Sequence, residues 1–306
     1  SKGVAFKDNA VLYRTNAQSN AIELSFKRNG IPYRIIGGTR FFDRAEVKDM
    51  LAYLCVINNT TDDLRLRRII NVPARGIGGK TLEIAERQAT AANLPIYDVI
   101  ADPKGYPALE KAAPKLRRFA ELIESLREKL TTMELPDFYD QVMLETGYIG
   151  MLEAKDDLDS RARKENVQEL KSSIVSYVEQ AEKPTLAGFL EEVSLYTDIE
   201  KYDQDADAAV MMTMHSAKGL EFPTVFLVGM EEGLFPGMRV LTDPDELEEE
   251  RRLCYVAITR ARDRLFLSHA KQRMLYGRTS FNRPSRFLQE IPEECVQERK
   301  RQMHTG

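Results

Sequence analysis

One segment carries several groups that could do chemistry: His215-Ser216-Ala217-Lys218-Gly219-Leu220-Glu221-Phe222. It follows one apolar run of strand length and precedes another. In open α/β sheets, ligands bind in the crevice beyond the carboxyl ends of the strands, which makes this segment a candidate site. Lys218 could contact a phosphate, Glu221 could accept hydrogen bonds from ribose hydroxyls, and His215 could contact a nucleic-acid backbone. An ordinary turn with a solvated charge pair would explain the same residues.

A second candidate is Arg260, near the carboxyl end of a helix predicted over residues 244–259. A planar, permanently charged guanidinium there could stabilise the charge on a transferring γ-phosphate. The alternative is a surface helix whose terminal arginine simply suits the helix dipole. We interpret the acidic run of residues 243–250 as a solvated loop and helix start, where negative charge is also favourable.

A third candidate is the segment Arg14-Thr15-Asn16, where a predicted strand enters a predicted helix at residues 16–29. These side chains and the first helical N–H groups are suitable donors to phosphates. Capping of the helix by Thr15 or Asn16 is the alternative, and the two roles are compatible.

A fourth candidate is the glycine-rich segment of residues 71–81, which includes Gly76-Ile77-Gly78. Its glycines would let backbone amides approach a phosphate, and Arg75 and Lys80 add charge. A plain interhelical turn is the alternative. The segment is not a phosphate-binding loop of the G-x-x-x-x-G-K-[ST] type, because Arg75 stands where the first glycine should be. We also find no strand-borne acidic pair suited to Mg²⁺.

The elements that must position these residues form an interrupted α/β pattern. Apolar runs at residues 10–13, 31–36, 209–214, 225–228 and 265–267 predict strands, and their lack of alternation is typical of a parallel sheet covered on both faces. Helical spacing dominates residues 44–202, and a polar linker follows at residues 203–207. We therefore predict one α/β domain in two parts, residues 1–43 and 205–306, interrupted by a helical insertion at residues 44–204.

Composition narrows the class of protein. The chain has 306 residues, 43% of them hydrophobic, and a formal net charge of -4, which argues against a disordered tail and against a protein coated in positive charge. A local DNA-binding groove remains compatible with this charge. No apolar run approaches the roughly 20 residues of a membrane span. Three widely spaced cysteines and three histidines predict neither a disulfide framework nor a zinc site.

Taken together and in order, these segments resemble the C-terminal half of UvrD/PcrA/Rep-type superfamily 1 DNA helicases. The segments that carry the resemblance are residues 12–19 (LYRTNAQS), 37–49 (GGTRFFDRAEVKD), 75–78 (RGIG), 213–223 (TMHSAKGLEFP), 229–236 (GMEEGLFP), 248–261 (EEERRLCYVAITRA) and 284–288 (PSRFL).

The resemblance implies a motor of two RecA-like domains, of which this chain would supply part of one. The fold implied is a partial RecA-like parallel-sheet domain, 2A, interrupted by a large all-helical insertion domain, 2B. The phosphate-binding loop, the Mg²⁺ carboxylates and the catalytic glutamate of the family belong to the other motor domain. We therefore expect a fragment of an ATP-dependent 3′→5′ helicase that uses ATP and Mg²⁺ when complete. Alone, the fragment should bind neither cofactor and should not hydrolyse ATP.

The resemblance also implies roles for single residues. The catalytic role falls to Arg260, as a γ-phosphate arginine. The other roles are ATP binding by Gly219, Glu221 and Arg260, single-stranded DNA binding by Arg14, Asn16 and His215, and duplex binding by Gly76, Ile77, Gly78 and Lys80. One departure is Gly237, which stands where some relatives place a DNA-facing histidine.

The expected partners are single-stranded DNA, single-strand/duplex junctions, the missing motor domains 1A and 1B, and DNA repair proteins, with no membrane. The expected location is the bacterial cytoplasm, in association with the nucleoid, with a role in DNA repair or replication. A competing interpretation is a non-catalytic module that binds DNA junctions or a protein partner through the helical insertion.

Overall fold

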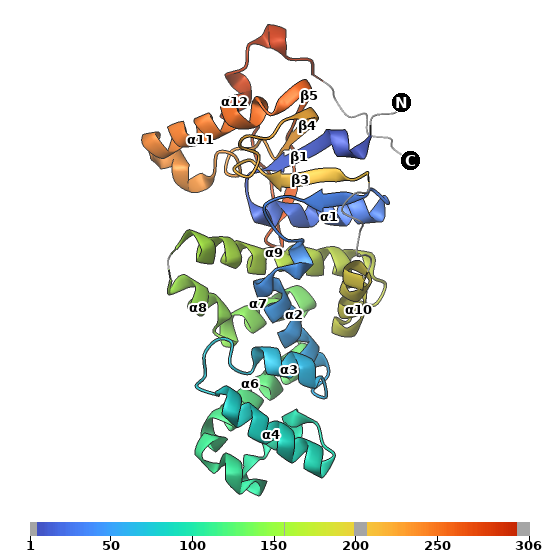
Figure 1. The fold of residues 1–306 in the computed structure, drawn as a ribbon, viewed down its shortest axis with the longest axis vertical. Helices are drawn as coiled ribbons and strands as arrows, with labels where there is room; N and C mark the ends of the chain where they lie inside the picture. Colours follow the sequence, from blue (N-terminus) through green and yellow to red (C-terminus); the bar gives the residue numbers. More distant parts are fainter. Residues whose placement is uncertain (1–4, 156, 199–206, 299–306) are drawn as a thin grey trace. The chain divides into compact units, whose positions relative to one another are not determined.

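The structure, a computed structural model, describes residues 5–155, 157–198 and 207–298 (Figure 1). Its contacts divide the chain into two compact units. The α/β unit consists of residues 1–38, 204–273 and 279–306, and the helical unit consists of residues 39–203 and 274–278. Of the predicted linker at residues 203–207, all but Asp207 lies outside the described residues.

The α/β unit is built on a parallel sheet of five strands in the order β2-β3-β1-β4-β5. The strands are β1 (Asn9–Tyr13), β2 (Tyr33–Ile35), β3 (Ala209–Thr213), β4 (Phe222–Val228) and β5 (Ala261–Ser268). Each of the five predicted strands is confirmed, and the two parts of the chain pair directly, with β1 between β3 and β4. The parallel sheet with a helical insertion is the predicted fold class.

Both faces of this sheet are covered, which explains the unbroken apolar runs. Successive residues of a strand point to opposite faces. In β1, Leu12 packs into a core that includes Cys254 and Ala257 of helix α11 (Pro244–Ile258). Its neighbour Val11 packs into a separate core with residues of helix α1 (Ser19–Arg28). The remaining helical segments of this unit are η1 (Phe6–Asp8), η2 (Asn16–Gln18), η6 (Met238–Thr242), α12 (Arg286–Gln289) and η7 (Glu293–Cys295).

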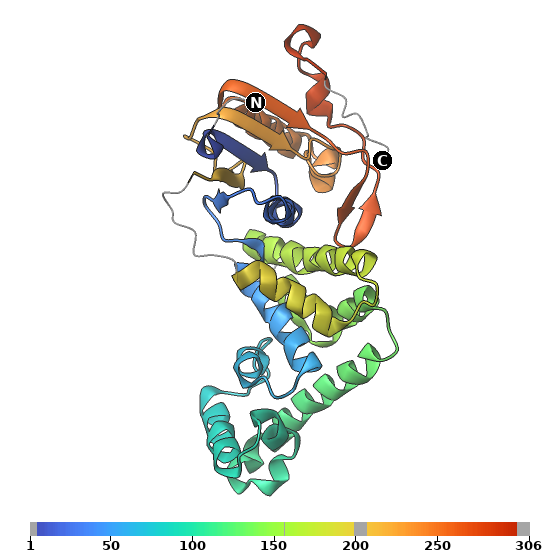
Figure 2. The same cartoon turned by 90° about the vertical axis from the view of Figure 1, so that its right-hand side faces the viewer.

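The helical unit contains nine α-helices within its described residues (Figure 2). They are α2 (Ala45–Asn58), α3 (Asp63–Ile69), α4 (Gly79–Ala92), α5 (Ile96–Ala101), α6 (Ala113–Leu130), α7 (Leu135–Glu145), α8 (Tyr148–Glu153), α9 (Leu158–Gln180) and α10 (Leu186–Asp198). Short 3₁₀ turns join them at η3 (Phe41–Asp43), η4 (Pro103–Gly105) and η5 (Pro107–Ala112). The short helices α5 and α8 were not predicted from the sequence. No helix in the described ranges is long and apolar enough to cross a membrane.

A small hairpin, β6 (Arg273–Leu275) and β7 (Arg278–Ser280), was also not predicted. Its tip belongs to the helical unit. There the N–H of Tyr276 donates to Glu169 of α9 at 2.9 Å, and the N–H of Gly277 donates to Ser172 Oγ at 2.9 Å. Tyr276 and Gly277 both have positive φ, of 54° and 72°, as a two-residue hairpin turn requires.

Candidate functional site

The segment of residues 214–221 runs from one end of the sheet to the other. Strands β3 and β4 both lie parallel to β1, on its two sides, so the chain leaves the carboxyl end of β3 and must return to the amino end of β4. His215 therefore lies at the carboxyl ends of the strands, whereas Glu221 directly precedes β4 at their amino ends. The segment was predicted to lie beyond the carboxyl ends of the strands; His215 lies there, and Glu221 lies at the opposite end of the sheet.

At the amino ends, Arg260 is held by three hydrogen bonds. Its Nε donates to the Val256 carbonyl at 2.9 Å, its Nη1 to the Leu220 carbonyl at 3.1 Å, and its Nη2 to Thr259 Oγ1 at 3.0 Å. These bonds use three of the five N–H groups of a guanidinium. The side chain is partly exposed, so the others are available to a phosphate. Two N–H groups of Arg260 therefore remain for an acceptor without a change of its three hydrogen bonds.

Glu221 lies beside Arg260, because the N–H of Phe222 donates to the Arg260 carbonyl at 2.9 Å. Its Oε2 accepts a hydrogen bond of 3.0 Å from Arg262 Nε, and both side chains are about half exposed or more. An exposed ion pair of this kind contributes little free energy, so a ligand hydroxyl can replace Arg262 at low cost. The backbone of Gly219 has φ +85°, a left-handed conformation that favours glycine.

At the carboxyl ends, Arg14 forms a bidentate ion pair with Glu250 of α11. Arg14 Nε lies 3.0 Å from both carboxylate oxygens, and Nη2 lies 2.7 Å from Oε1. Glu250 is buried, with 6% of its surface exposed. The interpretation of residues 243–250 as entirely solvated is therefore wrong at Glu250, because the inner face of α11 carries this carboxylate against Arg14.

His215 belongs to the same cluster. The loss of hydration around its imidazole and the positive charge of Arg14 lower the pKa of His215, while the charge of Glu250 opposes this. By surface area the residue as a whole is exposed. Asn16 is exposed at the start of η2, after a turn in which Gln18 Oε1 accepts the N–H groups of Arg14 and Thr15, both at 2.9 Å. Thr15 is the N-cap residue of η2, one of the two residues predicted for that position, and Gln18 at the third position of η2 accepts its N–H.

In the helical unit, hydrogen bonds between its own residues fix the conformation of the segment of residues 71–80. Asn71 Oδ1 accepts the N–H groups of Arg75 and Ile77 at 2.8 and 3.1 Å. The Arg75 guanidinium donates to the carbonyls of Pro73 and Thr146 at 3.1 and 2.9 Å. It also lies 5.7 Å from the Tyr53 ring centroid and 5.4 Å from that of Phe119. Arg75 is therefore a partly buried group bonded within this unit, and not a free basic group.

The four residues predicted to contact duplex differ in their surroundings. Ile77 is 2% exposed, so its side chain is a packing group that anchors the loop. Gly76 has φ +67°, and its carbonyl accepts a 3.1 Å hydrogen bond from Lys115. Gly78 precedes the first turn of α4 without a side-chain cap, and Gly78 and Lys80 are exposed. The amino end of α4 therefore presents backbone N–H groups and one lysine to solvent.

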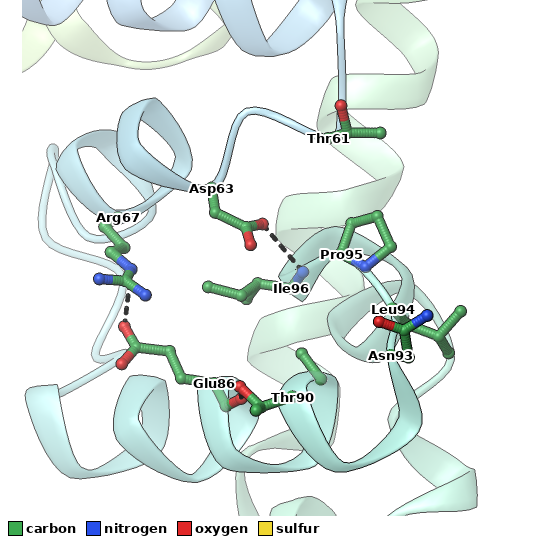
Figure 3. Close-up of a pocket in the computed structure, with 10 residues that line it drawn as sticks. Thr61, Asp63, Arg67, Glu86, Thr90, Asn93, Leu94, Pro95 and Ile96 are labelled. Carbon is green, nitrogen blue, oxygen red and sulfur yellow. Dashed lines mark hydrogen bonds and ion pairs between the residues drawn. The ribbon is translucent and has the colours of Figure 1, made fainter.

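A polar cavity of about 350 Å³ lies elsewhere in the helical unit, between α3, α4 and α5 (Figure 3). Its charged groups are paired with each other or with the backbone. Arg67 Nε lies 2.9 Å from Glu86 Oε1, and Asp63 accepts the N–H of Ile96 at 2.9 Å. None of the predicted site residues lines it. Among the described residues, no group of three or more acidic, histidine or cysteine side chains could hold a metal ion.

Comparison with known proteins gives a consistent family. The model of the UvrD-like helicase C-terminal domain matches residues 1–272. The chain is 44% identical to the ATP-dependent DNA helicase PcrA of Staphylococcus aureus (strain Mu50) over 299 residues, which is 96% of the chain and 41% of that protein. It is 44% identical to PcrA of Staphylococcus epidermidis (strain ATCC 35984) over 308 residues, 99% of the chain and 41% of that protein. The chain spans about two fifths of the length of these relatives, and it belongs to the UvrD-like helicase C-terminal domain family.

Proposed function

We propose that this chain supplies one side of the ATP cleft, part of the single-stranded DNA track and the duplex-contacting domain of an ATP-dependent 3′→5′ DNA helicase. In this proposal the α/β unit is motor domain 2A and the helical unit is domain 2B. The observation that carries it is the separation of the two candidate clusters. Arg260 and Glu221 lie at the amino ends of the sheet, and Arg14 and His215 lie at the carboxyl ends.

Helix α11 joins the two clusters. Glu250 lies against Arg14, and the helix ends at Ile258, eight residues later, a rise of about 12 Å. Arg260 follows two residues after the helix end. A displacement of α11 would therefore move both Arg260, the proposed γ-phosphate contact, and Glu250, which pairs with Arg14 at the proposed DNA contact. Such a shared rigid element is a physical route by which nucleotide binding and DNA binding influence each other.

At the ATP cleft, Arg260 would stabilise negative charge on the γ-phosphate, and Glu221 would accept hydrogen bonds from the ribose. ATP hydrolysis supplies the free energy of movement, and we expect the Mg²⁺ ligands on motor domain 1A. Arg260 is already fixed at three points, so it can enter the cleft with little loss of side-chain entropy.

The helical unit would contact the duplex through the amino end of α4. Gly78 lets a phosphate approach the backbone, and Lys80 adds one positive charge. This arrangement also supports the second candidate function, binding of DNA junctions by the helical unit without a motor, because the loop is organised by Asn71 and Arg75 of the same unit. Action in DNA repair or replication, contacts with repair proteins, and a location near the bacterial nucleoid complete the proposal.

The proposal is tested by Arg260→Ala in a polypeptide that also carries the first motor domain. We expect DNA-stimulated ATP hydrolysis to fall by about 10³-fold, the usual effect of losing such an arginine, with single-stranded DNA affinity unchanged. Arg264→Ala is the matched control, since Arg264 is an exposed arginine four residues further along β5. Equal rates for the two variants would refute the role of Arg260.

A further inference from the structure

We propose that Glu250 is a positioning residue, which holds the Arg14 guanidinium in the orientation that receives a phosphate of single-stranded DNA. This inference rests on the proposed function, because it concerns the same DNA contact. It adds a residue that the motif analysis placed in a solvated acidic run. The two residues are 236 positions apart in the sequence and meet only because β1 and α11 pack in one unit.

The first argument is the edge of the guanidinium that Glu250 occupies. The carboxylate accepts from Nε and Nη2, at 2.7–3.0 Å. The Nη1 group, which carries two N–H donors, lies outside this bidentate pair. A guanidinium clamped along one edge keeps its plane fixed, and its other edge can receive a second acceptor without a change of rotamer.

The second argument is the difference in exposure. The Glu250 side chain is 7% exposed, whereas that of Arg14 is 28% exposed. A phosphate arriving from solvent therefore meets Arg14 and does not reach the place that the carboxylate occupies. Glu250 therefore lies on the buried side of the Arg14 guanidinium, and a DNA phosphate can contact Arg14 without displacing the Glu250 carboxylate.

The third argument is that the backbone of Arg14 is fixed as well. The Arg14 N–H donates to Gln18 Oε1 at 2.9 Å, so the residue is held at its main chain and at its guanidinium. Fixed at both points, Arg14 would present one oriented positive charge to single-stranded DNA.

The test is a fluorescence-anisotropy titration of the 306-residue chain with a labelled thymidine oligonucleotide. The variant Glu250→Gln separates a positioning role of Glu250 from a purely electrostatic one, because the two roles predict changes of DNA affinity in opposite directions. If Glu250 matters only as a nearby negative charge, its removal strengthens binding to the polyanion. If Glu250 positions Arg14, we expect binding to weaken by about tenfold, the value of one charge-assisted hydrogen bond.

Glu249→Gln is the matched control, because Glu249 is exposed on α11, pairs with Arg252 and loses the same charge. We also expect Arg14→Ala to weaken binding as much as Glu250→Gln, and the double variant to be no weaker than Arg14→Ala. Circular dichroism verifies folding. If Glu250→Gln does not fold, Glu250→Asp replaces it, since a shorter side chain keeps the charge but loses the bidentate geometry.

The outcomes distinguish a failure of the positioning role of Glu250 from a failure of the proposed single-stranded DNA track. Unchanged or stronger binding by the Glu250 variant, with a wild-type chain that binds, overturns the positioning role and leaves the DNA track intact. A wild-type chain that shows no affinity for the oligonucleotide at low salt contradicts the proposed track, and the role of Glu250 falls with it.

Discussion

The substitution Arg75→Ala should lower the stability of the helical unit while leaving the proposed duplex contacts, Gly78 and Lys80, in place. The Arg75 guanidinium donates to the carbonyls of Pro73 and Thr146 and to the Tyr53 hydroxyl, the last at 2.7 Å. Alanine would remove charge-assisted hydrogen bonds to three carbonyls, those of Ile69, Pro73 and Thr146, each worth about 1.5–3 kcal/mol where fully buried. Because Arg75 is only partly buried, screening by solvent reduces this sum. We expect a net loss of about 3 kcal/mol in the free energy of unfolding.

Because the chain contains no Trp, urea unfolding is best followed by circular dichroism, which the helical unit dominates. Lys80→Ala is the control. Lys80 is exposed in the same segment, so its loss should change stability by less than about 0.5 kcal/mol. A midpoint for Arg75→Ala that coincides with that of Lys80→Ala would refute the structural role of Arg75 within the helical unit.

Three further predictions concern single side chains. The pKa of His215 is lowered in the folded chain, so the unfolded chain binds a proton more readily as pH falls below 6.5. The free energy of unfolding should therefore decrease over this range, and it should decrease less in His215→Gln, as urea unfolding at several pH values would show. Burial would raise the pKa of Glu231, but hydrogen bonds from Arg273 and the Ala270 N–H hold it below 4.5. Its contribution should therefore be present above that pH and lost in acid, and Glu231→Gln should cost about 3 kcal/mol in thermal or urea unfolding near neutral pH. Burial raises the pKa of Cys254 to about 12, so an alkylating reagent should label exposed Cys295 first, as peptide mass spectrometry would record.

The apolar runs predicted the sheet because its central strands are buried on both faces. In such strands nearly every position is apolar, and residues 10–13 and 209–212 give a clear signal. The hairpin at residues 273–280 gave no such signal. Its strands are three residues long, and its turn is Tyr276-Gly277, without the Asn-Gly or Asp-Gly pair that usually marks a two-residue turn.

The candidate site was predictable where one side chain acts alone and not where two distant ones meet. The place of Arg260 just beyond the end of a helix was predicted and is confirmed, and its role at a phosphate stays a prediction. The pairing of Arg14 with Glu250 could not, since it depends on the packing of α11 against the sheet. A helical projection would have placed Glu250 with Leu253, Cys254 and Ala257 on the inner face, and that is the one signal available in the sequence. Arg75 was misread for the converse reason, because local sequence does not reveal that Tyr53 and Phe119 surround it.

The most direct test of the account compares binding of the 306-residue chain to single-stranded DNA, blunt duplex and a 3′-tailed junction, at two salt concentrations. We predict that Arg14→Ala weakens binding to single strands and to the tailed junction and leaves blunt-duplex affinity nearly unchanged, whereas Lys80→Ala weakens binding to the duplex and the junction and leaves single-strand affinity nearly unchanged. Phosphate contacts should make both affinities fall steeply with salt. Equal losses on all three DNAs from both variants, or affinities that neither variant alters, would contradict the assignment of single-strand and duplex contacts to separate units.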